Sequence, residues 1–295
     1  MEAAANTPDW LASCRRIAAE LTAMFEAYPS TRERAVEVGR GEGGDQTLVI
    51  DDAAEGLIFA ELERLHARGA QFTAISEERG EVAYGSGSTR VVIDPIDGSM
   101  NAKRGLWPYT VSIAVAEPPF EGRGEPTMAD VNFGYVHDFG LDEEWCATRS
   151  GGALLNGRPL ERNAAERRTA AGLLELVAVE SARPEWIAAG LPALAGVAHR
   201  LRAYGSIAFS LCQLAACRVD GMVTFWSSRS VDCAAAQLIL RESGGEIAFT
   251  AAREPLGMLL DLQSRSPIAA ARTAASVAEL AAVPAEAGRL RSSKR

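Results

Sequence analysis

Histidine and cysteine are both scarce in this chain of 295 residues. The three histidines, His66, His137 and His199, are widely spaced, so a zinc site or a Ser-His-Asp site would have to draw on very few side chains. The five cysteines form no CxxC pair and are odd in number, which argues against a disulfide scaffold. This cysteine usage favours a reducing cytoplasm.

Positive charge and long apolar runs are also lacking. The 39 acidic residues outnumber the 30 basic ones and give a net charge of −9. Because nucleic-acid-binding proteins usually carry the opposite sign, DNA or RNA is not expected as a partner. No apolar run reaches the roughly 18 residues of a membrane helix, and the acidic start is unlike a signal peptide, so no membrane partner is expected. An acidic protein that handles anions must neutralise them locally, which favours bound cations.

Apolar spacing predicts mixed secondary structure in the first half of the chain. Thr7 and Pro8 read as the start of a helix that Pro29 ends, and a second helix is expected over about 52–68. Residues 31–47 read as a loop or irregular hairpin. Strands are expected at 71–75, 90–93, 109–116, 131–136 and 144–148. Two helices followed by consecutive strands indicate an α+β arrangement.

After residue 160, strands alternate with helices, which is typical of an α/β fold. Strands are expected at 173–180, 200–204, 222–226 and 246–249, and helices at 184–198, 206–218 and 231–243. We therefore expect two domains, an α+β domain at 1–155 and an α/β domain at 156–283. Residues 284–295 form a polar tail that is expected to fray.

The motif DPIDGS at 94–99 carries the strongest chemical signal. Pro95 and Gly98 force a turn at the end of the predicted strand, so Asp94 and Asp97 can point into one small volume. Paired carboxylates beside a helix start suit hard cations that bridge protein and phosphate. The plainer interpretation is a strand-to-helix turn with an aspartate cap.

Three further acidic positions are weaker signals. Glu77 and Glu78 follow a predicted strand, although two adjacent glutamates usually mark a solvated loop. Asp232 precedes an apolar helix, where an N-cap is the commoner role. Asp52 with Glu55 resembles a capping box, which leaves Asp51 unexplained by capping.

In their order, SEE at 76–78, DPIDGS at 94–99 and VDCAAAQLILRESGG at 231–245 resemble the inositol monophosphatase superfamily of magnesium-dependent, lithium-sensitive sugar phosphatases. The resemblance covers roughly residues 45–270. It includes GYVHD at 134–138 and the segment 146–160, which look like the central hairpin and connecting segment of that superfamily. It implies a layered αβαβα sandwich, a phosphoric monoester hydrolase and a homodimer.

The resemblance also implies the ligands of two Mg²⁺ ions. Glu77 would bind metal and hold the attacking water, and Asp94 would bridge the two ions. Ile96 would give its backbone carbonyl to the first ion. Asp97 and Asp232 would be the remaining ligands of the second ion. Glu78 is expected to lie outside this set or in solvent.

The same resemblance assigns the water and the substrate. Asp51 and Ser99 match an acid–hydroxyl pair that orients or activates water, and Gly98 and Ser99 would offer backbone N–H groups to the phosphate. The superfamily usually has threonine at Ser99, so the hydroxyl is retained. The residues expected to contact the substrate are Asp97, Gly205, Ser206, Ile207 and Arg229.

The expected sugar pocket departs from the superfamily pattern. Val231 replaces a common tryptophan, Ile207 replaces a small residue, and the segment 224–227 lacks the glutamate that binds inositol. We therefore expect an intact metal site and an altered pocket, closest to microbial members, some of which also hydrolyse fructose 1,6-bisphosphate. Arg229 and Arg202 could hold a second phosphate away from the metals, or could be surface arginines and salt-bridge partners.

The leading hypothesis is Mg²⁺-dependent hydrolysis of myo-inositol 1-phosphate or a similar small sugar phosphate by metal-activated water. The alternative is a fructose-1,6-bisphosphatase or a dual-specificity phosphatase, ahead of a nucleotide 3′-phosphatase or histidinol-phosphatase. A non-catalytic metal or phosphosugar binder would not need Glu77 and Asp51. A glycosidase using two of the carboxylates would keep its activity in a chelator.

Overall fold

A computed structural model describes residues 8–40, 46–120, 124–162, 164–181 and 183–283 of the chain. The expected tail at 284–295 and the middle of the expected loop at 31–47 lie outside these residues. The described part of that loop contains a short helix, α2 (Thr31–Arg34), and the strands β1 (Glu37–Arg40) and β2 (Gln46–Leu48), which pair antiparallel. Residues 31–47 are therefore better described as a hairpin preceded by one helical turn.

An eight-stranded sheet forms the first half of the molecule, with strand order β10-β9-β8-β7-β6-β5-β3-β4. β3 and β5 are parallel neighbours, and the other neighbouring pairs are antiparallel. The strands are β3 (Phe72–Ser76), β4 (Gly80–Tyr84), β5 (Arg90–Asp97), β6 (Thr110–Ala116), β7 (Phe133–Asp138), β8 (Glu143–Thr148), β9 (Gly152–Leu155) and β10 (Arg158–Pro159). The parallel pair matters most, because β3 and β5 end at the same edge.

A five-stranded sheet forms the second half, with strand order β12-β11-β13-β17-β15. β11 runs parallel to both of its neighbours, whereas β17 is antiparallel to β13 and β15. The strands are β11 (Leu174–Glu180), β12 (Ala198–Arg202), β13 (Gly221–Thr224), β15 (Glu246–Phe249) and β17 (Ile268–Ala271). Two further strands of two residues each, β14 (Ser228–Arg229) and β16 (Arg265–Ser266), form a separate antiparallel pair.

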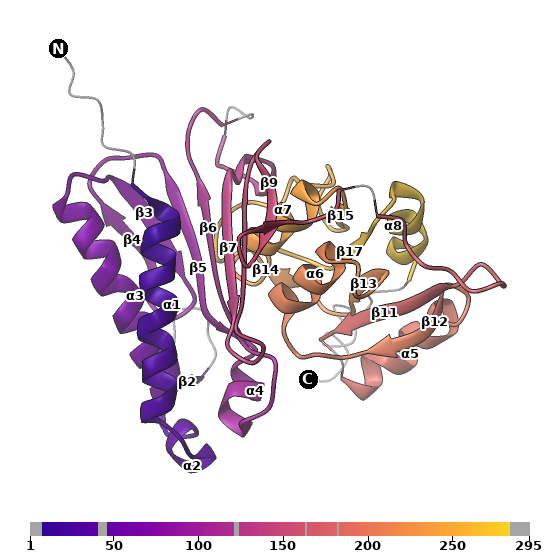
Figure 1. The fold of residues 1–295 in the computed structure, drawn as a ribbon, viewed down its shortest axis with the longest axis horizontal. Helices are drawn as coiled ribbons and strands as arrows, with labels where there is room; N and C mark the ends of the chain where they lie inside the picture. The colour runs from indigo at the N-terminus through magenta and orange to yellow at the C-terminus, as the bar shows by residue number, and fades with distance from the viewer. Residues whose placement is uncertain (1–7, 41–45, 121–123, 163, 182, 284–295) are drawn as a thin grey trace, which may run out of the picture.

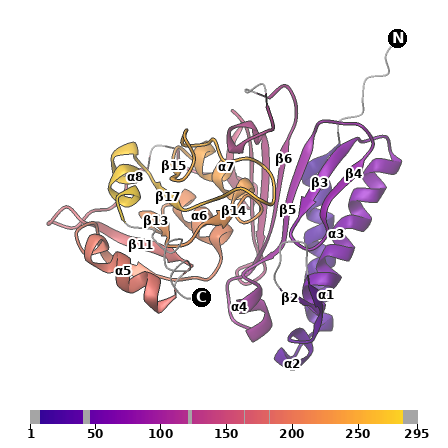
Figure 2. The ribbon, with the colours of Figure 1, turned by 180° about the vertical axis from the view of Figure 1, so that it is seen from behind.

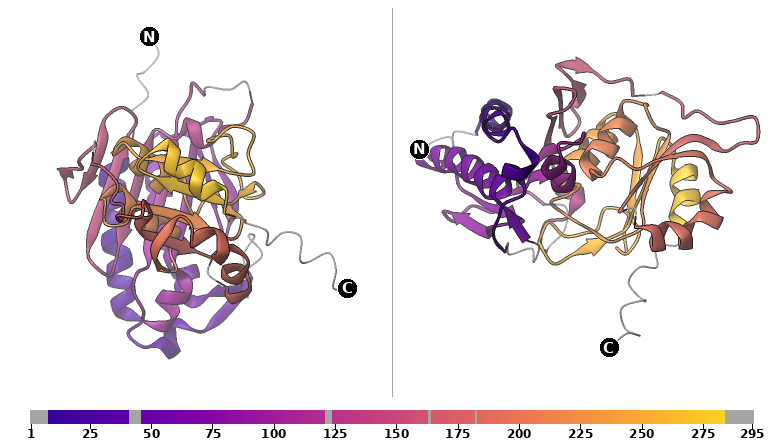
Figure 3. Two further views of the ribbon diagram at one scale, coloured as in Figure 1. Left: turned by 90° about the vertical axis from the view of Figure 1, so that its right-hand side faces the viewer. Right: turned by 90° about the horizontal axis from the view of Figure 1, so that it is seen from below.

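Helices and sheets stack in five layers, as Figures 1 and 2 show from opposite sides. Helices α1 (Trp10–Ala27) and α3 (Val49–Ala67) cover one face of the eight-stranded sheet, and α6 (Ile207–Ala215) and α7 (Ala234–Glu242) lie between the two sheets. Helices α5 (Pro184–Leu194) and α8 (Ala274–Ala281) cover the outer face of the five-stranded sheet. The end-on view in Figure 3 shows the same order, which confirms the predicted αβαβα sandwich.

The middle layer explains why the two sheets stay together. Every residue of helix α7 except Arg241 is buried, as expected for a largely apolar helix that lies between two sheets. Its small residues allow close approach, since a Cβ added to Gly134 on β7 would lie 2.6 Å from the carbonyl oxygen of Ala235. The same core holds Trp145 of β8, which is fully buried. Burial of these apolar side chains between the two sheets stabilises the contact between the two halves of the molecule.

Several local predictions need correction. Helix α1 begins at Trp10 rather than at Pro8, and its cap is Asp9, whose side chain accepts the N–H of Ala12 at 3.0 Å. The predicted cap Thr7 lies outside the described residues. Helix α3 begins at Val49 rather than near residue 52. Helix α8 and the strands β4, β9, β10 and β17 were not predicted. The division into domains at 155 and 156 stays a prediction, and it would separate the paired strands β9 and β10.

Candidate active site

A bulge at the end of β5 brings two carboxylates to one side. Asp94 pairs with Ser112 and Asp97 with Thr110, and the register shifts between these pairs, so β5 carries an extra residue there. Asp94 and Asp97 would face opposite sides of a regular strand, whereas the bulge lets both line one cavity. Gly98 follows with φ +98°, and a Cβ there would meet carbonyl oxygens at 3.1 and 3.3 Å. A residue without a side chain is therefore required at this turn.

Asp97 connects this turn to the second half of the chain. Its Oδ2 accepts the hydroxyl of Ser206 at 2.5 Å and the N–H of Ala208 at 2.6 Å, at the start of α6. Burial raises the pKa of Asp97 to about 7, although the Ser206 hydrogen bond opposes the shift. Asp97 is 8% exposed. The predicted substrate residue Ser206 is thus a buried support of Asp97.

Glu77 and Glu78 follow β3 at the same sheet edge as Asp94. Glu55 of α3 fixes this turn, because its carboxylate accepts the hydroxyl of Ser76 and, at 3.2 Å, the N–H of Arg79. Glu78 accepts the hydroxyl of Thr47. Both glutamates line the cavity, so the turn is not simply a solvated loop.

Asp51 lies in the first turn of α3, and the predicted capping box was wrong. The N–H of Leu48 donates to Asp51 Oδ2 at 3.1 Å, so Asp51 rather than Asp52 caps the first turn of the helix. Glu55 instead accepts the hydroxyl of Ser76 at the end of β3. Asp51 Oδ1 is buried without a hydrogen-bond partner in the described structure. Burial raises the pKa of Asp51 to about 7, against the hydrogen bond from Leu48. A buried carboxylate oxygen without a partner is unusual unless something binds it.

Asp232 and Arg229 come from the other half of the chain. The N–H of Arg229 donates to Asp232 Oδ2 at 2.8 Å, and the cap of α7 is Cys233, so Asp232 is not the N-cap. The guanidinium of Arg229 lies 2.6 Å from Glu77 Oε1 and 3.6 Å from Asp232 Oδ1. The expectation that Arg229 reaches away from the metal carboxylates is therefore wrong.

Glu77, Asp94 and Asp232 each present a carboxylate oxygen within 4.8 Å of the other two. Burial and then the charges of Asp97, Glu77 and Asp232 hold the pKa of Asp94 well above its ordinary value. A divalent cation would offset the repulsion between these crowded carboxylates, and oxygen atoms are the ligands that Mg²⁺ prefers. The residues present therefore fit a metal ion.

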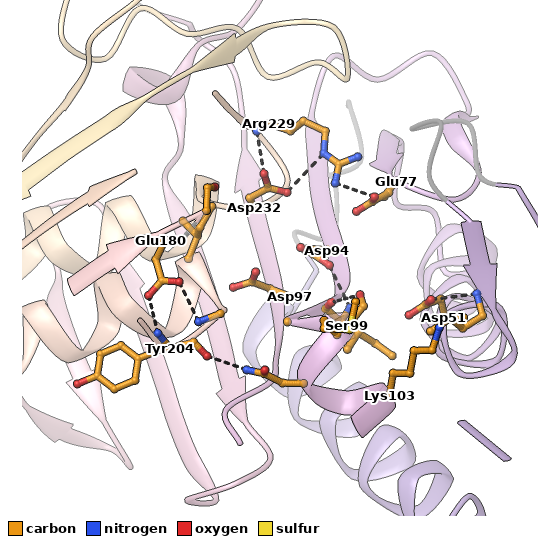
Figure 4. Close-up of a pocket in the computed structure, with 18 of the residues that line it drawn as sticks. Asp51, Glu77, Asp94, Asp97, Ser99, Lys103, Glu180, Tyr204, Arg229 and Asp232 are labelled. Atoms are coloured by element: carbon orange, nitrogen blue, oxygen red, sulfur yellow. Dashed lines mark hydrogen bonds and ion pairs between the residues drawn. The ribbon is translucent and has the colours of Figure 1, made fainter. Parts of the chain in front are cut away.

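The predicted residues meet in one cavity of about 660 Å³, shown in Figure 4. Its lining includes Asp51, Glu77, Asp94, Ile96, Asp97, Gly98, Ser99, Gly205, Ile207, Arg229 and Asp232. The Ser99 hydroxyl donates to the carbonyl of Ile96 at 2.8 Å. The Asp51–Ser99 pair and the Ile96 metal contact stay predictions.

Sequence reasoning missed one wall of the cavity. Glu180, at the end of β11, accepts the N–H groups of Tyr204 at 3.0 Å and Gly205 at 2.8 Å and the hydroxyl of Ser210 at 2.6 Å. Asn101 donates to the carbonyls of Pro108 and Tyr204, both at 2.7 Å. The position of Glu180 at the carboxyl end of a strand parallel to both neighbours was the available signal.

The substrate wall departs from the predicted one in two places. Residues 224–227, where an inositol-binding glutamate was missing, do not line the cavity, whereas Glu180, Ser181 and residues 203–205 do. Arg202 is exposed, donates to the carbonyl of Leu201 at 2.8 Å and lies outside the cavity lining. The proposed role of Arg202 in binding a phosphate is therefore not supported by its position.

A family model described as the inositol monophosphatase family matches residues 11–285. The chain belongs to the inositol monophosphatase family. A fructose-1,6-bisphosphatase/inositol-1-monophosphatase of Methanothermobacter thermautotrophicus is 29% identical over 269 residues, 89% of this chain and 91% of the relative. An inositol-1-monophosphatase of Mesorhizobium japonicum is 31% identical over 222 residues, 70% of this chain and 72% of the relative.

A solved structure described as an inositol monophosphatase–fructose 1,6-bisphosphatase has the same fold as this family member. Its TM-score is 0.77 at 22% identity, and the match covers 93% of this chain and 99% of the other. Membership of the inositol monophosphatase family identifies the protein as a metal-dependent phosphoric monoester hydrolase of sugar phosphates. Among the described helices, none is long and apolar enough to span a bilayer.

Proposed function

We propose that this phosphatase hydrolyses myo-inositol 1-phosphate with Mg²⁺ as its metal. The observation that carries the proposal is the cluster of Glu77, Asp94 and Asp232 oxygens within 4.8 Å of one another, on a cavity that Asp51 also lines. The relative from Mesorhizobium japonicum, which is named an inositol-1-monophosphatase, supports this choice of substrate.

Five groups would hold the metal: the carboxylates of Glu77, Asp94, Asp97 and Asp232 and the carbonyl of Ile96. Asp97 Oδ2 already accepts two hydrogen bonds, and a carboxylate keeps further lone pairs for a cation. When bound, a divalent cation lowers the pKa of its water and offsets the charge of the phosphate.

The protein's own side chains would handle the water and the ester. Glu77 would hold the attacking water, and Asp51 would accept its proton at Oδ1, the oxygen that has no partner among the described residues. Ser99 would orient that water through its hydroxyl. No covalent nucleophile is needed, since positioning and charge stabilisation dominate phosphoryl transfer.

The substrate would lie between the two halves of the cavity. The backbone N–H groups of Gly98 and Ser99 would bind the phosphate. Asp97, Gly205, Ser206 and Ile207 would form the sugar side, with Ser206 acting through Asp97 because it is buried. Arg229, which lies beside Glu77, would contact the substrate at its phosphate end. Glu180 would support this wall through its bonds to Tyr204 and Gly205.

Fructose 1,6-bisphosphate is a second candidate substrate, and Lys103 is the observation that favours it. Lys103 lines the cavity from α4 (Ser99–Arg104) and is the only lysine among the described residues. Within that part of the chain it forms no ion pair with a carboxylate, whereas Arg229 is paired with Glu77. A lysine that lines the cavity and forms no such ion pair among the described residues could receive a second phosphate.

The resemblance to the family further supports a homodimer, and cysteine usage supports a cytoplasmic setting. Light scattering on the purified full chain tests the dimer, since a monomer at micromolar concentration would contradict it.

A panel of sugar phosphates assayed with Mg²⁺, without added metal and in excess chelator tests the activity. We expect hydrolysis of myo-inositol 1-phosphate with Mg²⁺ and none in chelator. Hydrolysis of fructose 1,6-bisphosphate alone would favour the second candidate. Full activity in excess chelator would overturn the metal-dependent mechanism.

A further inference from the structure

Arg229 lies in the middle of the carboxylates that the proposed metal requires. Figure 4 shows its side chain reaching across the cavity between Asp232 and Glu77, with Asp94 nearby. Its guanidinium is 2.6 Å from Glu77 and 3.6 Å from Asp232, and its own N–H holds the other oxygen of Asp232 at 2.8 Å. The side chains of these three residues are only 12–16% exposed.

Two of the three carboxylates in the cation cluster are therefore already paired with a positive charge. Although burial opposes the charge of Arg229, the carboxylates of Asp232, Glu77 and Asp94 raise its pKa further, so the guanidinium stays charged. Breaking a buried ion pair by removing one partner leaves an uncompensated charge. Arg229 thus holds Glu77 and Asp232 together when no other cation compensates their charge.

A divalent cation on the same oxygens changes this balance. Glu77 Oε1 can either contact the guanidinium, as it does here at 2.6 Å, or bind a metal ion. A positively charged guanidinium also repels a nearby divalent cation. The backbone contact of Arg229 to Asp232 does not depend on the side chain, so the guanidinium can move without disturbing the start of α7. Arg229 borders the cavity in which the proposed phosphate would bind.

We propose that Arg229 is the resident counter-ion of the cation site: it pairs with Glu77 in the metal-free protein, releases it when a divalent cation binds, and then binds the substrate phosphate. This inference rests on the proposed metal-dependent function. Binding of metal and of phosphate are then coupled, because the guanidinium becomes free for a bidentate contact only after it leaves Glu77.

Calorimetric titration of MgCl₂ into the chelator-treated full chain at fixed pH tests the first half of this proposal. Arg229→Met keeps a long side chain without charge, Arg229→Lys keeps the charge, and Arg202→Met removes an exposed arginine outside the cavity. We expect Arg229→Met to bind Mg²⁺ about tenfold or more tightly than wild type, since it loses a competing charged contact. Arg229→Lys and Arg202→Met should stay close to wild type.

Thermal unfolding provides a readout without any activity. Metal-free Arg229→Met should melt below wild type, and Mg²⁺ should raise its melting temperature by a larger amount. Arg229→Gln serves as a second uncharged variant in case Arg229→Met does not fold. Equal or weaker Mg²⁺ binding by both uncharged variants would overturn the counter-ion inference while leaving the metal assignment intact. Absence of Mg²⁺ binding by wild type would overturn both.

Titration of inorganic phosphate tests the second half. With Mg²⁺ present, wild type should bind phosphate about tenfold or more tightly than Arg229→Met, and without Mg²⁺ the two should be similarly weak. Phosphate binding by wild type that is independent of both Mg²⁺ and Arg229 would overturn the coupling.

Discussion

Asp97 and Ser206 join the two halves of the molecule at the cavity. The Ser206 hydroxyl lies 2.5 Å from Asp97 Oδ2, and the two residues are separated by more than one hundred positions in the sequence. Because Ser206 also caps α6 by accepting the N–H of Phe209 at 3.2 Å, the start of that helix and the turn after β5 share one hydrogen-bonded centre. This contact therefore sets the distance between the end of β5 and the start of α6.

Asp94 is predicted to be essential for activity and costly for the metal-free fold. Asp94→Asn should lower kcat by at least about 10²-fold, as expected for a group that would hold the metal. The same change should raise the melting temperature in chelator, because it removes a buried charge crowded by Glu77, Asp97 and Asp232. Kinetics with Mg²⁺ and melting curves in chelator measure the two effects. Unchanged activity would remove Asp94 from the site.

The two adjacent glutamates are predicted to differ. Glu77→Gln should lower kcat by at least about 10²-fold, because the charge that holds metal and water is lost. Glu78→Gln should have a smaller effect, since Glu78 accepts a hydroxyl from Thr47 and lies outside the cation cluster. Measurement of kcat and KM for both variants on one substrate provides a matched comparison. A silent Glu77→Gln beside a damaging Glu78→Gln would reverse the assignment.

Lys103 is predicted to determine whether a second phosphate is accepted. Lys103→Met should raise KM for fructose 1,6-bisphosphate about tenfold or more, since a charged hydrogen bond contributes roughly 1.5–3 kcal/mol. KM for myo-inositol 1-phosphate should change little, because its single phosphate lies at the metal site. Arg202→Met is the control for a general loss of charge. Equal losses on both substrates would instead indicate a role for Lys103 beside Asp51.

Replacement of Arg229 by methionine is predicted to affect both substrates. Arg229 is paired with Glu77 and therefore lies where, under the proposed function, every substrate would place its reacting phosphate. Both substrates should therefore be affected, which separates Arg229 from Lys103 in the same assay.

Glu180 is predicted to make stability depend on pH. Burial raises the pKa of Glu180 from 4.5 to about 7, against hydrogen bonds from Ser210, Tyr204 and Gly205. Below about pH 4.5 the group is protonated in both the folded and unfolded states. As pH rises toward 7, the unfolded chain ionises first, so the folded state loses up to roughly 3 kcal/mol of stability.

Urea unfolding of wild type and Glu180→Gln at pH 5 and pH 7.5 checks this prediction. Wild type should lose stability relative to Glu180→Gln between the two pH values. Glutamine places an amide donor near backbone N–H groups. The free energy of unfolding is therefore expected to differ between the two proteins at both pH values. A difference that does not change with pH would show that Glu180 ionises normally in the folded protein.

Local sequence determined most of the helices and strands and the position of the DPIDGS motif. Apolar periodicity predicted most strands of both sheets and the long helices, because burial of one face imposes a period on the sequence. The DPIDGS motif predicted that Asp94 and Asp97 share one side, although a bulge within β5 rather than a turn brings them there. The family resemblance supplied the roles of Glu77 and Asp232. Short elements such as β14 and β16 leave no such pattern, since two residues cannot express a period.

Only the tertiary structure decided how the charges are paired. The sequence places Arg229 three positions before Asp232 but says nothing of its contact with Glu77, which lies more than one hundred residues away. It marks Glu55 as half of a capping box, whereas packing of α3 against β3 turns that carboxylate toward Ser76. Glu180 and Lys103 reach the cavity because parallel strands end at one edge and α4 follows the turn after β5. Hydrogen bonds and ion pairs of this kind depend on distances across the fold, and local residue order does not encode those distances.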